Sequence, residues 1–123
     1  MADGYGAMPG DATTMADVYP NDVSGRVLSG MRASGADMSA SYDVDFEHIF
    51  PDLRAAEEFV RRVAGRGRQV KQSEYDGRSG YYWEVRVVVR MVPTYAGITR
   101  TEEELAGIAD SCGGCADGWG ILA

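Results

Sequence analysis

Alternation between apolar and polar residues predicts a β-strand from about residue 42 to residue 50. One set of alternate positions holds aromatic residues, valine and histidine: Tyr42, Val44, Phe46, His48 and Phe50. The other set starts with three acidic residues, Asp43, Asp45 and Glu47. Successive side chains of a strand point to opposite sides of the sheet. This strand is therefore expected to have one buried face and one polar face.

A β-hairpin is predicted to follow. The turn formers Asp76-Gly77-Arg78-Ser79-Gly80 separate an extended segment at about 68–75 from a second one at 81–92. The second segment alternates again, with Trp83, Val85, Val87, Val89 and Met91 on one side and Tyr82, Glu84, Arg86, Val88 and Arg90 on the other. It is expected to have one buried and one polar face as well.

Apolar residues at helical spacing predict two helices before the hairpin. The first runs from about residue 22 to 34 and stops at Gly35. The second is capped by Asp52 and ends at Gly65 or Gly67. Its apolar stripe consists of Leu53, Ala56, Phe59, Val60 and Val63.

A third helix is expected to begin at Thr101. Thr101 and Glu104 have the spacing of a capping box, and the acidic first turn suits the positive end of the helix dipole. Gly113-Gly114 stops this helix, and a short last strand is expected over 119–122.

The order of elements after the first helix, β-α-β-β-α-β, predicts an α+β fold. It is the order of a ferredoxin-like sandwich, here with an extra N-terminal helix, in which two helices cover one face of a four-stranded antiparallel sheet. We expect residues 19–123 to form this single domain. Residues 1–18 lack any periodicity and are expected to be a disordered leader.

The uncovered sheet face is the candidate protein-binding surface. In the predicted fold the first and third strands are central neighbours, so acids of one can pair with arginines of the other. The candidate residues are Asp43, Asp45, Glu47, Tyr82, Arg86 and Arg90. A mixture of apolar, aromatic and charged groups suits binding. The alternative is that these charges only keep an exposed face hydrated.

Composition places the chain among cytoplasmic globular proteins. Its 123 residues are 45% apolar and 25% charged, and no apolar run approaches the roughly 20 residues of a membrane-spanning helix. The N-terminus has neither the basic nor the apolar region of a secretory signal. We therefore expect a cytoplasmic protein that makes no membrane contact.

The net charge of -7 disfavours direct nucleic-acid binding. Residues 1–50 carry eight acids and two arginines, whereas residues 51–123 carry eleven acids and ten basic residues. An acidic field repels phosphates, and nucleic-acid binding depends on clustered lysine and arginine. One run of cations, Arg61, Arg62, Arg66, Arg68 and Lys71, leaves a direct RNA-binding module as an alternative function.

The C-x-x-C pair of Cys112 and Cys115 is a weak indication of metal or redox chemistry. Structural zinc needs four ligands, and His48 is the only other soft candidate. We expect His48 to be a structural residue, Cys112 to lie in the core and Cys115 in a loop, with no metal or cofactor. A small metal or redox enzyme using these residues is a further alternative, although no known catalytic motif occurs and no catalytic residue is assigned.

Two short stretches carry a family resemblance: Val92-Pro93-Thr94-Tyr95, followed by Ile98-Thr99 and the acidic helix start at Glu102, and Asp117-Gly118-Trp119-Gly120. The stretches Phe50-Pro51-Asp52 and Pro20-Asn21-Asp22 extend the likeness over about residues 19–122. In combination they resemble the RraB-type ribonuclease E inhibitor family.

The resemblance implies a ferredoxin-like protein inhibitor without catalytic activity. By resemblance the partner is ribonuclease E, the endoribonuclease that initiates messenger RNA turnover, or its non-catalytic scaffold region. The family-motif residues are Pro93, Thr94, Tyr95, Asp117, Gly118, Trp119 and Gly120. The chain departs from the family in its Gly-rich leader before Val18 and in the arginines of its sheet face. Trp119 is expected to anchor the last strand on the core, and the alternative is a hot spot for the partner.

Overall fold

The computed structural model describes residues 19–122 and divides the chain into two compact units, residues 1–38 and residues 39–123. The expected disordered leader, residues 1–18, lies outside the described residues. The single domain over residues 19–123 stays a prediction. Within the described residues, the first unit contains one helix and the second contains the sheet with its two helices.

α2 (Val23–Ala33) is the helix of the first unit. Asp22 caps its start, because the Oδ1 of Asp22 accepts a hydrogen bond of 2.8 Å from the backbone N–H of Gly25. Gly35 follows its end with a φ of 94°, a left-handed conformation that glycine adopts without a steric penalty. The helix predicted between residues 22 and 34 is confirmed.

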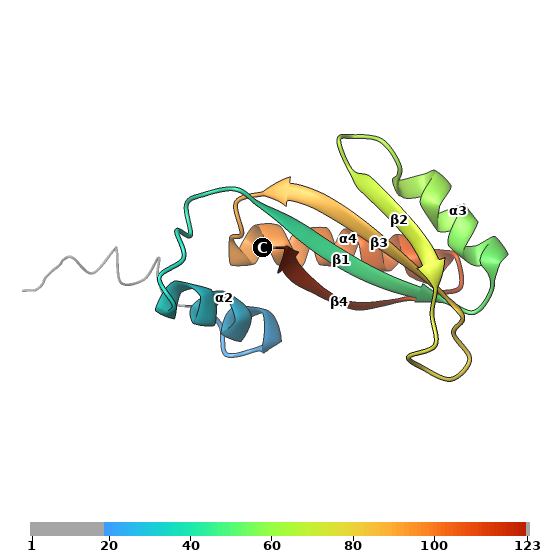
Figure 1. Ribbon diagram of the computed structural model, residues 1–123, viewed down its shortest axis with the longest axis horizontal. Helices are drawn as coiled ribbons and strands as arrows, with labels where there is room; N and C mark the ends of the chain where they lie inside the picture. The colour runs from blue at the N-terminus through green and yellow to red at the C-terminus, as the bar shows by residue number, and fades with distance from the viewer. Residues whose placement is uncertain (1–18, 123) are drawn as a thin grey trace, which may run out of the picture. The chain divides into compact units, whose positions relative to one another are not determined.

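The second unit contains a four-stranded antiparallel sheet (Figure 1). Its strands are β1 (Tyr42–Phe50), β2 (Gln69–Glu74), β3 (Trp83–Met91) and β4 (Cys115–Leu122). The strand order is β2-β3-β1-β4, and every neighbouring pair is antiparallel. β1 and β3 are therefore the central neighbours, as predicted, and the order is compatible with a ferredoxin-like sandwich.

Helices α3 (Leu53–Val63) and α4 (Tyr95–Ser111) pack on one face of this sheet (Figure 1). One buried apolar cluster joins them to the inward positions of β1 and β3: Val44, Phe46, Phe50, Ala56, Phe59, Val63, Val85, Val87, Ile98, Leu105 and Ala109. The predicted α+β class is confirmed. Leu53 differs from the expected stripe, because it starts α3 and is 39% exposed. Within residues 19–122, no helix has the length and apolarity needed to cross a bilayer.

α4 begins at Tyr95, and not at Thr101 as the capping-box spacing predicted. Thr94 is its cap, because the Oγ1 of Thr94 accepts a hydrogen bond of 3.0 Å from the backbone N–H of Gly97. The additional turns place Ile98 in the buried core. Burial of such a side chain contributes about 2 kcal/mol, so tertiary packing favours the earlier of two local start signals, Thr94 over Thr101.

β4 is longer than predicted, because it begins at Cys115 and not at Trp119. A register shift in its pairing with β1 leaves Asp117 as an extra residue beside Gly118, whose φ is 122°. A glycine suits this bulge because other side chains are strained at such a φ. Cys115, which was expected in a loop, therefore lies in a bulged strand.

The tip of the β2–β3 hairpin, residues 75–82, lies over one end of the outer sheet face. Arg78 Nη2 donates a hydrogen bond of 3.2 Å to the Sγ of Cys115, and Cys115 lies opposite Ile49 in the β1–β4 register. Ile49 is fully buried although its strand position faces away from the helices. The hairpin tip therefore covers the outer face at this end.

His48 is buried on the inner face of β1, with 1% of its surface exposed. Its ring centroid lies 4.7 Å from that of Phe59, and its Nδ1 has no hydrogen-bond partner among the described residues. Burial lowers the pKa of His48 to about 4, because the imidazolium would lose its hydration. His48 is therefore a neutral core residue, in agreement with the structural role predicted for it.

Trp119→Ala is expected to lower the free energy of unfolding by on the order of 3 kcal/mol, because it removes packed ring surface and leaves a cavity. Trp119 lies opposite Phe46 and packs, half-buried, against the core. Urea denaturation measures the change. Leu122→Ala is the control on the same strand, since Leu122 is 43% exposed, and it should cost about 0.5 kcal/mol or less. Unchanged stability in Trp119→Ala would contradict a core role and favour a partner contact.

His48→Leu is expected to make stability less sensitive to acid. An unfolded histidine has a pKa near 6.5 and the folded His48 a pKa of about 4. Between these values the unfolded chain binds the proton and the folded chain does not. The wild type therefore loses stability as the pH falls through this window, by up to roughly 3 kcal/mol. Urea denaturation at about pH 7 and about pH 4.5 measures the difference. An equal loss in wild type and variant would mean that His48 is protonated in the fold.

Candidate functional site

The outer face of the sheet, away from α3 and α4, carries the charged residues predicted from the sequence. Arg90 Nη1 lies 3.4 Å from Asp43 Oδ1, and Arg86 Nη2 lies 3.4 Å from Glu47 Oε2. Both pairs join residues that lie directly opposite each other on β1 and β3. The expected cross-strand ion pairs are therefore confirmed.

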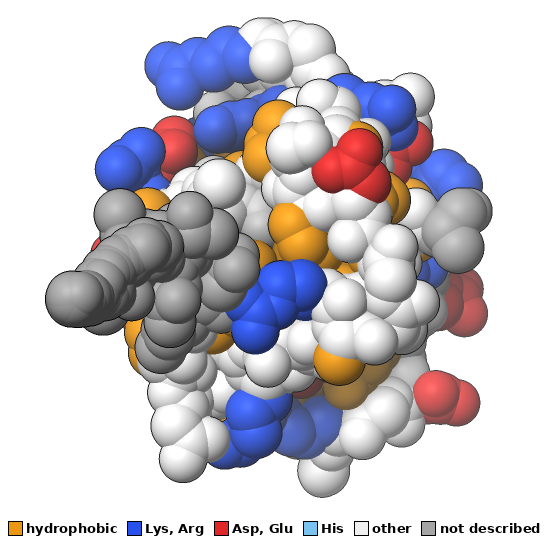
Figure 2. All heavy atoms as spheres, turned by 90° about the vertical axis from the view of Figure 1, so that its left-hand side faces the viewer, with side chains coloured by type: hydrophobic (Ala, Val, Ile, Leu, Met, Phe, Trp, Pro, Cys, Tyr) orange, Lys and Arg blue, Asp and Glu red, His pale blue; other side chains and the backbone are white. Residues whose placement is uncertain are grey.

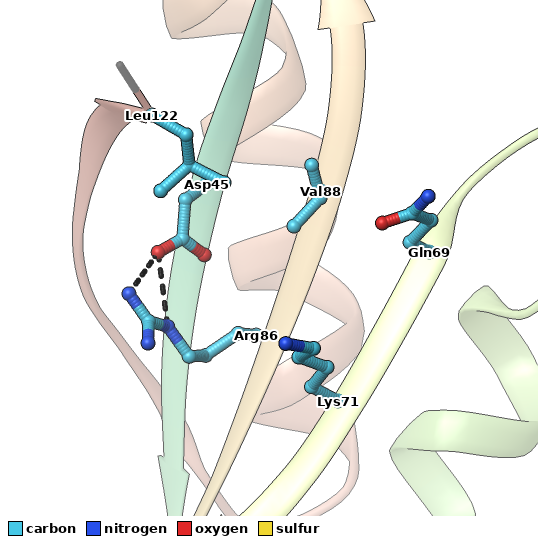
Figure 3. Close-up of a pocket in the computed structure, with 6 residues that line it drawn as sticks. All are labelled: Asp45, Gln69, Lys71, Arg86, Val88 and Leu122. Atoms are coloured by element: carbon cyan, nitrogen blue, oxygen red, sulfur yellow. Dashed lines mark hydrogen bonds and ion pairs between the residues drawn. The ribbon is translucent and has the colours of Figure 1, made fainter.

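Asp45 differs from the prediction because it is buried, with only 2% of its surface exposed. Its Oδ2 accepts a hydrogen bond of 2.9 Å from the Nε of Arg86 and a second one from Nη2 of the same guanidinium (Figure 3). The bond to Asp45 raises the pKa of Arg86. Arg86 compensates a buried carboxylate, so its removal would leave an unpaired charge inside the sheet.

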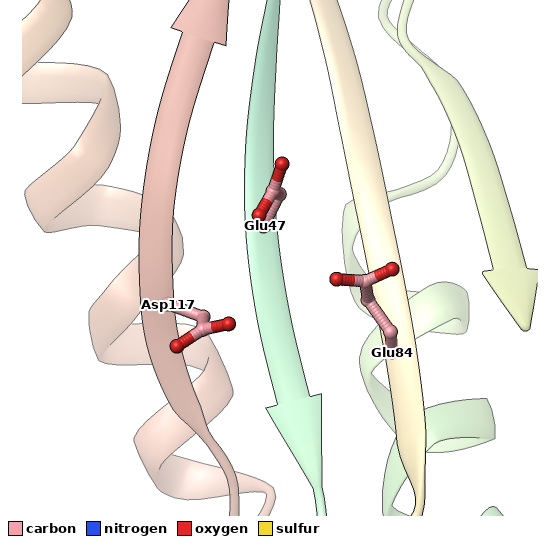
Figure 4. Close-up of side chains that lie close together, drawn as sticks. All are labelled: Glu47, Glu84 and Asp117. Atoms are coloured by element: carbon pink, nitrogen blue, oxygen red, sulfur yellow. The ribbon is translucent and has the colours of Figure 1, made fainter. Parts of the chain in front are cut away.

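Three carboxylates form an acidic cluster: Glu47, Glu84 and Asp117, whose oxygens lie within 4.8 Å of one another (Figure 4). The bulge in β4 brings Asp117 to this position. Burial raises the pKa of Glu47 and of Glu84, and the neighbouring carboxylates raise both further. Carboxylate oxygens can bind Mg²⁺ or Ca²⁺. Exposed acids are also common without a cation, so we assign no metal to this cluster.

A pocket of about 140 Å³ lies on the same face (Figure 3). Residues of all four strands line it: Asp45, Gln69, Lys71, Arg86, Val88 and Leu122. Only Asp45 and Arg86 belong to the predicted site. Gln69 and Lys71 flank the inward-facing Val70 on β2, so the strand period could have placed both of them on this face.

Tyr82 is the aromatic residue of the predicted site, and its side chain is exposed. It precedes β3, and 61% of its surface is exposed. A hydrogen bond of 2.9 Å from its backbone N–H to the carbonyl of Phe50 holds its position. Exposed tyrosine beside charged residues is typical of protein interfaces. The charged site residues thus form two groups, Arg90 with Asp43 and Arg86 with Asp45 and Glu47. Tyr82 lies just before β3, two residues from Glu84.

Most of the family-motif residues lie where they support the fold. Pro93 is buried just before α4, Thr94 caps that helix, and Tyr95 is its first residue. Gly118 forms the bulge and Trp119 packs against the core. These contacts explain how the motifs support the fold, and they do not by themselves define a binding site.

The candidate metal and redox residues do not converge. Cys112 packs against the inner core, as expected. Cys115 contacts Arg78 on the other side of the sheet, and His48 faces Phe59. In residues 19–122, the acidic cluster is the only group of His, Cys, Asp and Glu side chains spaced for a shared ion. The described structure therefore gives no support to a site built from the two cysteines and His48.

The cation run of residues 61–71 is mostly paired with acids. Arg61 and Arg62 contact Glu58 at 2.5 and 2.8 Å, and the next two arginines contact Glu104 at 3.9 and 3.3 Å. On the face shown in Figure 2, blue basic side chains lie in several separate groups. The run does not provide the continuous unpaired cations that a phosphate backbone requires.

Comparison with protein families matches residues 21–121 to the family described as regulator of ribonuclease activity B. This segment includes nearly the whole of the described structure, from the cap of α2 into β4. Among curated proteins no match was found.

Glu84→Gln is expected to raise the free energy of unfolding at neutral pH by a few tenths to about 1 kcal/mol. The gain is this small because solvent screens the repulsion between the carboxylates. The pKa of Glu84 is raised in the fold, so its ionised form is disfavoured there, and the gain should shrink as the pH falls through that pKa. Urea denaturation at about pH 7 and about pH 4 measures it. Glu103→Gln, at an exposed position of α4, is the control. A loss of stability in Glu84→Gln would mean that the carboxylates attract a cation or share a proton.

Proposed function

The chain belongs to the regulator of ribonuclease activity B family, and on this premise we propose that it is a non-catalytic cytoplasmic protein that binds ribonuclease E and lowers its activity. The family match over residues 21–121 is the observation that carries this proposal. The contact is with the nuclease itself or with its scaffold region. The regulator acts by occupying its partner and contributes no catalytic group.

The outer sheet face supports recognition of a protein partner. It lies away from α3 and α4 and combines the exposed ring of Tyr82 with the charges of Asp43 and Arg90. Tyrosine and arginine are enriched among the residues that dominate protein interfaces. The face also carries more acids than bases, which favours a partner segment with a basic or neutral surface.

The charge distribution of the chain argues against RNA as the direct ligand. The chain has a net charge of -7, and four arginines of the cation run contact Glu58 or Glu104. Phosphate binding needs cations whose counterions can be released. The nuclease therefore fits this face better than its RNA substrate does.

Tyr82→Ala and Arg90→Glu are expected to weaken binding of purified ribonuclease E by about fivefold or more, because each removes or reverses an exposed interface group. Both side chains are largely exposed, and the Arg90–Asp43 pair is a surface pair, so stability should change by about 1 kcal/mol at most. Isothermal titration calorimetry measures affinity, and cleavage of a short RNA by ribonuclease E measures inhibition.

Leu53→Ala and Arg54→Glu are the matched controls, because both positions are exposed on α3 in the helical layer. Their affinity should equal that of the wild type. Equal affinities in all four variants would place the contact away from the outer face. Absence of any binding by the wild type would overturn the proposed function, and tight RNA binding by the isolated chain at about 0.15 M salt would favour an RNA-binding module.

A further inference from the structure

The pocket on the outer face contains polar groups that have no partner. The Oδ1 of Asp45 is buried and accepts no hydrogen bond from any described residue. The side chains of Gln69 and Lys71, exposed across the pocket on β2, make no hydrogen bond or ion pair among residues 19–122. Buried polar groups without partners are uncommon in folded proteins and cost free energy. The pocket therefore combines one buried acceptor without a partner, on Asp45, with two exposed side chains that can donate.

The strand register explains why Lys71 stays unpaired. Lys71 lies directly opposite Arg86 in the β2–β3 pairing, and like charges in this relation repel. Arg86 is held on its other side by Asp45 and Glu47. In Figure 3 the side chains of Gln69 and Lys71 extend from β2 toward β3, while the free oxygen of Asp45 points toward Val88. Donors and acceptor thus approach the pocket from opposite sides.

The size of the pocket indicates a single side chain as its occupant. Its volume of about 140 Å³ is below the roughly 300–1,000 Å³ of sites that enclose small-molecule ligands. Val88 and Leu122 provide apolar surface for a short aliphatic stem. A pocket of this kind suits an anchor residue presented by a protein partner.

Charge complementarity selects the head group of that residue. A carboxylate would meet the unpaired oxygen of Asp45, and an ammonium or guanidinium would meet Lys71 and Arg86. An apolar group would leave Asp45 without a donor. A primary amide satisfies both sides, because its N–H can donate to Asp45 and its carbonyl oxygen can accept from Lys71 or Gln69.

We propose that this pocket binds the primary amide of an asparagine or glutamine side chain of the protein partner. The inference rests on the proposed function, since the partner is the ribonuclease or its scaffold region. The amide would place one neutral, doubly hydrogen-bonded anchor at the centre of an otherwise charged contact. Its stem would lie between Val88 and Leu122.

The first test compares Lys71→Met with Arg54→Met in binding to ribonuclease E. Lys71 is the only lysine of the chain and is exposed on β2, so its replacement should leave the fold intact. We expect affinity to fall about tenfold in Lys71→Met, the value of one hydrogen bond to a charged group, and to stay unchanged in Arg54→Met. This tenfold ratio should be the same at low and high salt, because the occupant is neutral. A ratio that shrinks with salt would indicate a carboxylate or phosphate instead and overturn the proposal.

The second test does not depend on the ribonuclease. Propionamide, propionate and propylammonium have similar shapes and differ in head group, so each is titrated into ¹⁵N-labelled protein. Propionamide should shift the backbone amide signals of Gln69, Lys71, Val88 and Leu122 in the wild type, and less so in Lys71→Met. Larger shifts with either charged probe, or no shift with propionamide, would overturn the amide pocket.

The two tests separate the two proposals. If the wild type binds ribonuclease E and Lys71→Met binds it with the same affinity, the amide pocket is contradicted and the proposed function stands. No affinity in the wild type, together with propionamide shifts at the pocket residues, would overturn the proposed function and retain an amide pocket for another partner.

Discussion

The antiparallel register between β1 and β3 is the constraint on which both faces of the sheet depend. It places Phe46 opposite Val87 in the core and, one residue along, Glu47 opposite Arg86 on the outer face. A slip of one residue would turn acids toward the helices and phenylalanines toward solvent. The same pairing that buries the core therefore assembles the charged surface, and neither can change without the other.

Strand periodicity made most of this architecture predictable. The alternation in residues 42–50 and 81–92 was sufficient to place the acids of β1 beside the arginines of β3, because the period of a strand is strictly two. The early start of α4 at Tyr95 was not predictable in this way, because it depends on the burial of Ile98. The bulge at Asp117 and the cover over Ile49 depend on contacts between distant segments, which a local pattern does not contain.

The sequence predicted on which face of the sheet the candidate residues lie, but not how deeply each of them is buried. Alternation assigns Asp43, Asp45 and Glu47 to one side and treats them alike. In the structure Asp45 is buried against Arg86 while Asp43 remains partly exposed. Arg86 consequently serves the stability of the sheet, and a charge reversal there would expose a buried carboxylate to a second acid. Arg90, whose ion pair with Asp43 lies at the surface, is the arginine that we propose for recognition.

The recognition surface that we propose depends, through Leu122 on β4, on the completeness of folding. Leu122 lines the pocket beside residues of β1, β2 and β3 only when β4 is paired with β1. This pairing is a contact between segments that are far apart in the chain. Contacts of this kind are slow to form, because closing the intervening loop costs entropy. A molecule in which β4 has locally opened has an incomplete surface, so a partner that needs the whole surface discriminates against partly unfolded chains. By mass action it also stabilises the closed sheet.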